Sequence, residues 1–233
     1  MNYQFGLTSE FACSYLENKQ ERLLVAVDDN LQSVDGYTFL MSQGFRRGGN
    51  QIYRPHCSHC QACQSLRVLV EKFKPSKSQK RLLKKNTQFR TKITTKIANN
   101  YYPLYESYIN TIHYDGAMYP ATKAQFQSFL LSEQQLAKQL FLEIWHKDKL
   151  ISVAVTDELP NALSAVYTFY HPEYKKFALG VFSILMQLQL SLQLAKPYLY
   201  LGYQIDECKK MNYKNRYFPY EIFRENNWQL VNK

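Results

Sequence analysis

The chain has 233 residues, and its 45% share of hydrophobic residues is enough to build a core in one large domain or two closely packed small ones. Its formal net charge is +10, and residues 72–96 alone hold ten basic residues and no acidic one. Such a concentrated basic field favours a polyanion such as nucleic acid, since a merely solvated helix face mixes both signs. The opening MNYQFGLTSEF lacks the basic and apolar regions of a secretion signal, and no apolar run reaches spanning length. We therefore expect a soluble, cytoplasmic protein with no membrane partner.

The first 70 residues predict short strands and turns around a group of cysteines. Residues 23–29, LLVAVDD, form one such strand. The string RPHCSHCQACQSL then spaces three cysteines three residues apart. Thiolates so spaced bind zinc or iron–sulfur clusters, which makes Cys13, Cys57, Cys60 and Cys63 candidate metal ligands. Five cysteines without a secretion signal indicate reduced structural thiols as well, and this is the interpretation we favour.

Residues 71–140 predict three helices. In PSKSQKRLLKKN, Ser76 and Gln79 have the spacing of a capping box and precede good helix formers, so the basic residues lie on a helix. Residues 99–114 carry aromatic and aliphatic side chains on one helical stripe, and residues 122–132 begin with the same capping spacing. We expect the aromatic stripe to lie in the core.

The last hundred residues alternate between strand and helix patterns. Residues 139–159 predict two strands joined by a tight turn, and residues 162–172 predict a third. A helix over 180–195 and a strand over 197–203 follow. This order is typical of an α+β fold with a mixed sheet, like that of N-acetyltransferases.

We accordingly divide the chain into three parts. They are a cysteine-containing N-terminal region, a part with basic and aromatic helices, and an acetyltransferase-like catalytic region, at residues 1–70, 71–140 and 141–233.

Several strings resemble the arginyl-tRNA–protein transferase family, in particular its short bacterial branch. They are GYTFLMSQGFRRGGNQIYRPHCSHCQACQSLRV, FKPSKSQKRLLKKN, VAVTDELPNALSAVYTFYHPEY, ALGVFSILMQL, PYLYLGYQIDECKKMNYK and FRENNW. They occur in the family's order over nearly the whole chain. The resemblance implies an enzyme that moves leucine from leucyl-tRNA to the α-amine of proteins beginning with Asp or Glu, which marks them for N-degron proteolysis. It also agrees with an acetyltransferase-like catalytic half.

The chemistry so implied needs no covalent intermediate, because the aminoacyl ester is already activated. The candidate that accepts the proton or orients the amine is Asp157 in the string TDELP, and its alternative role is to cap a turn before Pro160. Tyr167, Tyr200 and Tyr203 alternate with apolar residues on predicted strands. We expect them either to donate hydrogen bonds to the ester carbonyl or ribose, or to pack in the core.

Recognition of an acidic first residue calls for a fixed cation, and Arg suits a carboxylate by its bidentate fork. The candidate substrate-binding residues are Arg46, Arg47, Arg54, Arg67, Lys77, Lys80 and Arg81. Among them we favour Arg47, Lys80 and Arg81. The candidate tRNA-binding residues are Lys84, Lys85, Lys209, Lys210, Tyr213 and Lys214. For the last four, an exposed basic turn is the alternative.

The cysteine pattern departs from that of the family in one place. Eukaryotic members carry a C-x-x-C pair near the N-terminus, whereas here Leu16 stands where a partner of Cys13 is expected. This favours structural thiols over zinc or an iron–sulfur cluster, and we expect no required cofactor.

Two other functions account for part of these features. An acyl-CoA N-acetyltransferase shares the predicted fold but carries a glycine-rich pyrophosphate loop, where this chain has Gly180 alone. A zinc-containing RNA-binding module explains the cysteines and the basic helix, but it leaves the last hundred residues without a role.

Overall fold

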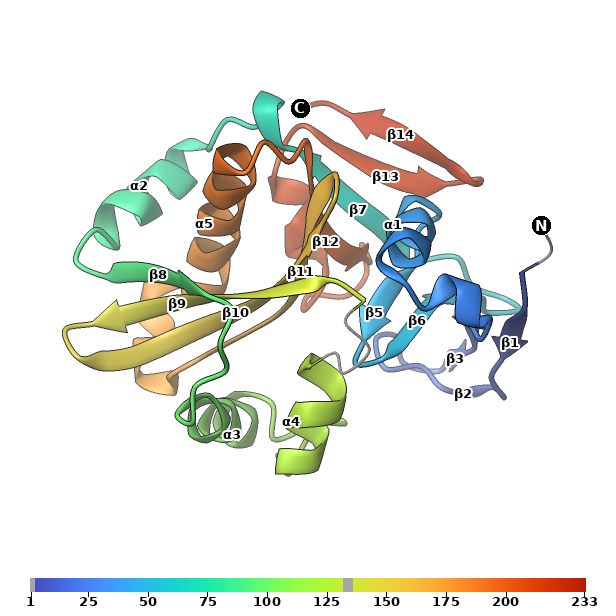
Figure 1. The fold of residues 1–233 in the computed structure, drawn as a ribbon, viewed down its shortest axis with the longest axis horizontal. Helices are drawn as coiled ribbons and strands as arrows, with labels where there is room; N and C mark the ends of the chain where they lie inside the picture. The colour runs from blue at the N-terminus through green and yellow to red at the C-terminus, as the bar shows by residue number, and fades with distance from the viewer. Residues whose placement is uncertain (1–2, 132–135) are drawn as a thin grey trace.

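The computed structural model describes residues 3–131 and 136–233, which form an α+β fold around an eight-stranded mixed sheet (Figure 1). The strand order in this sheet is β14-β13-β7-β12-β11-β10-β9-β8. Neighbouring strands run antiparallel except β11 and β12, which run parallel. The α+β class expected from the sequence is confirmed.

The last part of the chain builds the middle of this sheet in the predicted order. β9 (Lys138–His146), β10 (Lys149–Leu159) and β11 (Ala162–Tyr170) pair as consecutive antiparallel strands. Helix α5 (Leu179–Gln193) then crosses over to β12 (Tyr198–Gln204), which lies parallel to β11. A parallel pair requires such a crossover, because a tight turn joins only antiparallel strands. The acetyltransferase-like arrangement is thus confirmed.

Strands from elsewhere in the sequence complete the sheet. β7 (Gln64–Leu69) follows the cysteine string and lies between β12 and β13 (Tyr220–Arg224). β14 (Asn227–Val231) forms one edge, and β8 (Arg90–Thr94) forms the other edge beside β9. The cysteine string is therefore tied directly to the middle of the large sheet.

The N-terminal residues form a smaller sheet of four strands. Its order is β1-β4-β6-β5, with bounds Phe5–Leu7, Leu23–Ala26, Gln51–Pro55 and Arg46–Gly48. A two-stranded hairpin, β2 (Phe11–Ala12) with β3 (Gln20–Glu21), lies in the same part of the chain. The strand predicted within residues 23–29 is confirmed as β4.

Helix α1 (Val34–Ser42) lies where the sequence pattern predicts only short strands and turns. Ser33 caps this helix by accepting a hydrogen bond from the backbone N–H of Gly36. A Cβ at position 36 would lie 2.6 Å from the backbone of Leu31, so glycine is required here by close packing.

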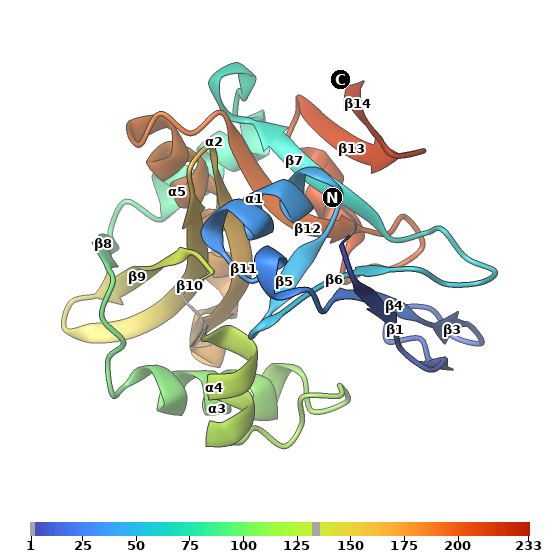
Figure 2. The same ribbon diagram turned by 45° about the vertical axis from the view of Figure 1, so that its right-hand side comes forward.

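The remaining helices cover the two faces of the large sheet (Figures 1 and 2). α2 (Lys77–Lys85) packs on α5, and its predicted capping box between Ser76 and Gln79 is formed. α3 (Tyr101–Ile112) and α4 (Lys123–Leu130) cover the other face, and the aromatic stripe of α3 lies in the core as predicted. Ser132, the last residue of the predicted third helix, lies outside the described residues.

Short 3₁₀ helices connect these elements: η1 (Asp29–Leu31), η2 (Val70–Lys72), η3 (Pro172–Phe177) and η4 (Asn212–Arg216). Among residues 3–131 and 136–233, no helix is long and apolar enough to cross a membrane.

A buried ion pair joins the two sheets. Arg47 of β5 donates from Nε and Nη2 to the two carboxylate oxygens of Asp157 on β10, each at 2.7 Å, and both side chains are 0% exposed. The third donor, Nη1, reaches the carbonyl of Gly49 at 2.8 Å. The Tyr37 hydroxyl of α1 donates to Asp157 Oδ2 at 3.2 Å. The smaller sheet and α1 are thereby fixed against the large sheet.

Replacing Asp157 by Asn is expected to lower the free energy of unfolding by about 3–5 kcal/mol, because it leaves the Arg47 cation buried without a counter-charge. Urea denaturation of the purified protein measures this. The matched control is Asp115→Asn, which removes the exposed pair with Lys210 (3.3 Å) and is expected to cost less than about 1 kcal/mol. Equal losses for the two variants would show that the buried pair does not hold the sheets together.

Candidate active site

The parallel strands β11 and β12 diverge towards their carboxyl ends. They pair only from Ala162 to Ser164 against Tyr198 to Tyr200, although β11 continues to Tyr170. In sheets with parallel strands, ligands bind outside the carboxyl ends where neighbouring strands part. This end of β11 and β12 is therefore a candidate ligand site.

Arg46 of β5 reaches into this divergence. Its Nη2 donates to the carbonyl of Val166 on β11 at 3.2 Å, and its guanidinium carbon lies 5.7 Å from the ring centroid of Tyr203 on β12. Gly202 makes room for it: a Cβ there would lie 2.6 Å from Arg46 Nη1, and its φ of +76° is one that favours glycine. A cation is thus held between two strands that no longer pair.

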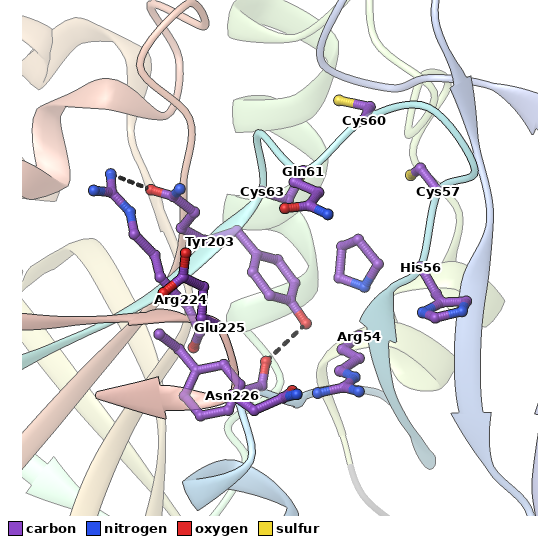
Figure 3. Close-up of a pocket in the computed structure, with 15 residues that line it drawn as sticks. Arg54, His56, Cys57, Cys60, Gln61, Cys63, Tyr203, Arg224, Glu225 and Asn226 are labelled. Atoms are coloured by element: carbon purple, nitrogen blue, oxygen red, sulfur yellow. Dashed lines mark hydrogen bonds between the residues drawn. The ribbon is translucent and has the colours of Figure 1, made fainter. Parts of the chain in front are cut away.

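A pocket of about 530 Å³ lies beside Tyr203 (Figure 3). Its size is in the range of small-ligand sites. Figure 3 shows Tyr203 on one side, His56 on the opposite side, Arg54 below, and Cys60 and Gln61 above. The lining residues are Gly44, Arg54, Pro55, His56, Cys57, Cys60, Gln61, Cys63, Gln64, Ser65, Tyr203, Phe223, Arg224, Glu225 and Asn226.

Tyr203 forms the inner wall of this pocket. Its side chain is buried, and its hydroxyl donates to the carbonyl of Tyr53 at 3.0 Å. The carbonyl of Gly44 is a second, longer acceptor at 3.4 Å from the same hydroxyl. Burial raises the pKa of Tyr203 well above its usual value, so the hydroxyl stays protonated. Among the three tyrosines predicted for catalysis, this is the one that lines the pocket.

The other two predicted tyrosines lie in different surroundings. Tyr167 packs against aromatic rings of α3 and α4, with Phe129 at 5.6 Å between ring centroids. Tyr200 is buried and accepts a hydrogen bond from Arg67 at 3.1 Å. The structure does not bring the three together in one pocket.

The turn between β13 and β14 closes the pocket from the C-terminal side, and the sequence pattern did not point to it. Glu225 and Asn226 have φ values of +51° and +58°, as a two-residue hairpin turn of type I′ requires. Arg224 is held there by a hydrogen bond of 2.7 Å from Nη2 to Gln64 Oε1. Asn226, a residue that tolerates positive φ, was the available signal for this turn.

Lys214 lies where a phosphate contact is not expected. Its side chain is only 5% exposed, and its ammonium donates to the Tyr203 carbonyl and lies 3.6 Å from Met211 Sδ. Burial, reinforced by the Arg46 cation, lowers the pKa of Lys214 well below its usual value. Lys209 and Lys210, by contrast, are exposed, and Lys210 pairs with Asp115.

The cysteines gather beside the pocket. The hairpin of β2 and β3 holds Cys13 through a bond from its N–H to Lys19 O (2.9 Å), while Cys57, Cys60 and Cys63 line the pocket. Burial, with the neighbouring Cys13, Cys57 and Cys60, raises the pKa of Cys63 to about 12. Four thiols suit zinc in type and number. Within the described residues, however, no group of three or more His, Cys, Asp or Glu is arranged to hold a metal ion, so we derive no step from a metal.

The Cys63 thiol is expected to react with iodoacetamide at pH 8 at least a hundredfold more slowly than free cysteine. The thiolate is the reactive form, and a pKa of about 12 leaves very little of it at that pH. Mass spectrometry of timed samples gives the rate. The rate is expected to stay low after chelator treatment, whereas a metal-bound thiolate would become reactive once the metal is removed.

The remaining predicted cations fall into two groups. Arg47 is occupied by Asp157, and Arg67 pairs with Glu221 at 2.6 Å. Because Arg47 and Asp157 pair with each other, we assign both to joining the sheets. This role is favoured over substrate-carboxylate recognition for Arg47 and over proton transfer for Asp157. The exposed group lies along α2 and consists of Lys77, Lys80, Arg81, Lys84 and Lys85.

Comparison with known proteins gives a consistent picture. The family model described as "Arginine-tRNA-protein transferase, N terminus" matches residues 11–81, and "Arginine-tRNA-protein transferase, C terminus" matches residues 100–224. Relatives named aspartate/glutamate leucyltransferase include one from Pseudoalteromonas atlantica, 47% identical over 99% of this chain and 98% of its own length. Those of Aeromonas hydrophila and Vibrio cholerae are 46% and 44% identical, each over 97% of this chain and over 94% and 96% of their own.

Among solved structures, the chain is similar to the C-terminal domain of a putative lysylphosphatidylglycerol synthetase from Agrobacterium fabrum. The identity is 9% and the TM-score 0.46, over 74% of this chain and 52% of that chain.

Proposed function

Because this chain belongs to the arginine-tRNA-protein transferase family, we propose that it transfers leucine from leucyl-tRNA to the α-amino group of proteins that begin with aspartate or glutamate. The observation that carries this proposal is the nearly full-length similarity to relatives named aspartate/glutamate leucyltransferase. The product begins with leucine and enters N-degron proteolysis in the cytoplasm.

The reaction is an aminolysis of an ester. The neutral α-amine attacks the leucyl carbonyl, a C–N bond forms, the C–O bond to the tRNA ribose breaks, and the proton lost by the amine reaches the ribose oxygen. An α-amine with a pKa near 7.7–8.0 is partly neutral at cytosolic pH, so no strong base is needed. Holding amine and ester together in the right orientation supplies most of the acceleration, and we propose that no cofactor takes part.

The diverging carboxyl ends of β11 and β12 suit the leucyl ester. Arg46 stands there with donors left over from its bond to Val166, and it is positioned to bind an oxygen that becomes negative during the attack. Lys214 donates to the Tyr203 carbonyl in the same region. When it is protonated, it adds a second positive charge to that of Arg46. We place the ester beside Arg46 and the incoming amine across the Tyr203 ring.

Helix α2 suits the tRNA backbone. Its five basic residues recur at spacings of three and four, which puts them on one face, while Leu82 and Leu83 pack inward. Lys85 donates to the Lys176 carbonyl, but none of the five forms an ion pair within the described part of the chain. Cations without counter-charges in a row are what phosphate binding requires.

Purified protein with radiolabelled leucyl-tRNA is expected to label peptides that begin with Asp or Glu and to leave a peptide that begins with Ala unlabelled. The label should resist mild alkali, which removes the ester from tRNA but spares an amide. Replacing leucyl-tRNA by labelled acetyl-CoA should give no product. Absence of alkali-stable label on the Asp peptide in the first arm would overturn the proposed function.

Changing Lys80, Arg81 and Lys84 together to Gln is expected to weaken tRNA binding and to reduce the slope of log K against log salt concentration by about 2–3, because each phosphate contact contributes about 0.7–0.9. Filter binding from 50 to 200 mM salt measures the slope. The control changes Lys19, Lys123 and Lys147, exposed at other places, to Gln and is expected to keep the slope. If both triple variants lose slope equally, α2 is not the tRNA-binding surface.

A further inference from the structure

Among the arginines that line the pocket, Arg54 is half-buried and has guanidinium donors to spare. Arg47 and Arg67 are paired with carboxylates, and Arg224 is bound to the Gln64 amide. Within residues 3–131 and 136–233, Arg54 forms no ion pair and donates one hydrogen bond, from Nη1 to the Gln43 carbonyl at 3.2 Å. A guanidinium has five N–H groups, so a bidentate partner can still be accommodated.

Arg54 is also partly withdrawn from water. Its side chain is half-buried, with its guanidinium carbon 5.1 Å from the Phe45 ring centroid. Burial lowers the pKa of Arg54, and the nearby Tyr203 offsets this only in part. A cation that has lost hydration without gaining an anion is stabilised by an anionic ligand more than an exposed cation would be.

The place of Arg54 relative to the reacting groups fits an acceptor substrate. Arg54 follows Tyr53, whose carbonyl accepts the Tyr203 hydroxyl bond, and Tyr203 in turn stacks against Arg46 where we place the ester. The outer rim is open to solvent, because His56, Gln61, Glu225 and Asn226 are exposed. A polypeptide can therefore enter from the rim with its first residue at Arg54 and its amine near Tyr203.

A carboxylate fits this pocket better than a tRNA phosphate chain. A nucleic-acid backbone calls for several free cations in a row, such as those on α2, whereas the pocket is lined by two arginines, of which Arg224 already donates to the Gln64 amide. The carboxylate among its lining residues, Glu225, is exposed at the turn and forms no ion pair with Arg54. An isolated planar fork is suited to one side-chain carboxylate.

We propose that Arg54 binds the side-chain carboxylate of the acceptor's first residue, and that this pocket is where the enzyme distinguishes aspartate and glutamate from neutral residues. The proposal rests on the proposed function. A first residue of Asn has nearly the same shape as Asp but leaves the guanidinium without a charged partner, so it is rejected.

The test compares kcat/KM for two peptides that differ only in a first residue of Asp or Asn, with the same leucyl-tRNA. Arg54→Gln is expected to lower the Asp:Asn ratio by about ten- to a hundredfold, the size of one charge-assisted hydrogen-bonded contact. Arg54→Lys, which keeps the charge but not the fork, is expected to retain part of the ratio. The matched control is Arg216→Gln, which removes an exposed arginine away from the pocket and is expected to keep the wild-type ratio.

The outcomes separate this proposal from the function itself. If the wild-type protein forms no leucyl peptide, the function is wrong. If it does, and Arg54→Gln keeps the Asp:Asn ratio, the function holds and the pocket assignment is wrong. If Arg54→Gln lowers kcat/KM equally for both peptides while raising KM for leucyl-tRNA, the pocket binds tRNA, and the assignment is overturned in favour of nucleic acid.

A measurement on the wild-type protein covers the case in which the Arg54 variants fail to fold. Cys57 and Cys60 line the same pocket, so a cysteine-free peptide that begins with Asp is expected to slow their alkylation, whereas its Asn counterpart is not. Equal effects of the two peptides would overturn the proposal without any variant.

Discussion

The buried ion pair between Arg47 and Asp157 is the constraint on which the arrangement of the site depends. Two charges that are fully removed from water are tolerated only when they satisfy each other and their remaining donors. Here they do so through two bonds of 2.7 Å, with Gly49 and Tyr37 taking up the other contacts. The relative placement of the two sheets is fixed because any sliding would leave one charge unpaired.

The pair also determines where the next arginine lies. Successive side chains of a strand point to opposite sides, so with Arg47 held by Asp157, Arg46 is directed between β11 and β12. A slip of one residue in β5 would place Arg46 against Asp157 and direct Arg47 between β11 and β12. Gly202 allows the close approach of Arg46, and Gly49 allows the sharp turn beside Ser128, where a Cβ would lie 1.7 Å from a carbonyl oxygen.

The site is thereby assembled from segments far apart in the sequence. β6 and the cysteine string supply one wall, β12 supplies Tyr203, and the β13–β14 turn closes the other side. The arginines are then sorted by their partners: one joins the sheets, one stands by the diverging strands, and one faces the pocket. On α2 the cations form no ion pair with the residues that the structure describes, and they are exposed on the surface. The two proposals depend on this separation, with the polyanion on α2 and the single carboxylate at Arg54.

The elements whose signals are local could be predicted from the sequence. Ser76 and Gln79 start α2, the aromatic stripe of α3 lies in the core, and the strand–helix–strand order after residue 138 gives the mixed sheet, because caps and periodicity depend on neighbours a few residues away. The pattern left α1 unpredicted although Ser33 caps it, because glycine also occurs in turns and the packing of Gly36 against Leu31 is seen only in the fold.

The roles of the cations follow from their positions in the folded chain. Arg46, Arg47 and Arg54 look alike in the sequence, and Asp157 looked like a free carboxylate at the end of a strand. Whether a charge is paired, buried or left with donors to spare depends on which strand the fold lays beside it, more than a hundred residues away in the case of Arg47 and Asp157. Electrostatic energy is set by distance and burial in three dimensions, and residue type and spacing contain neither.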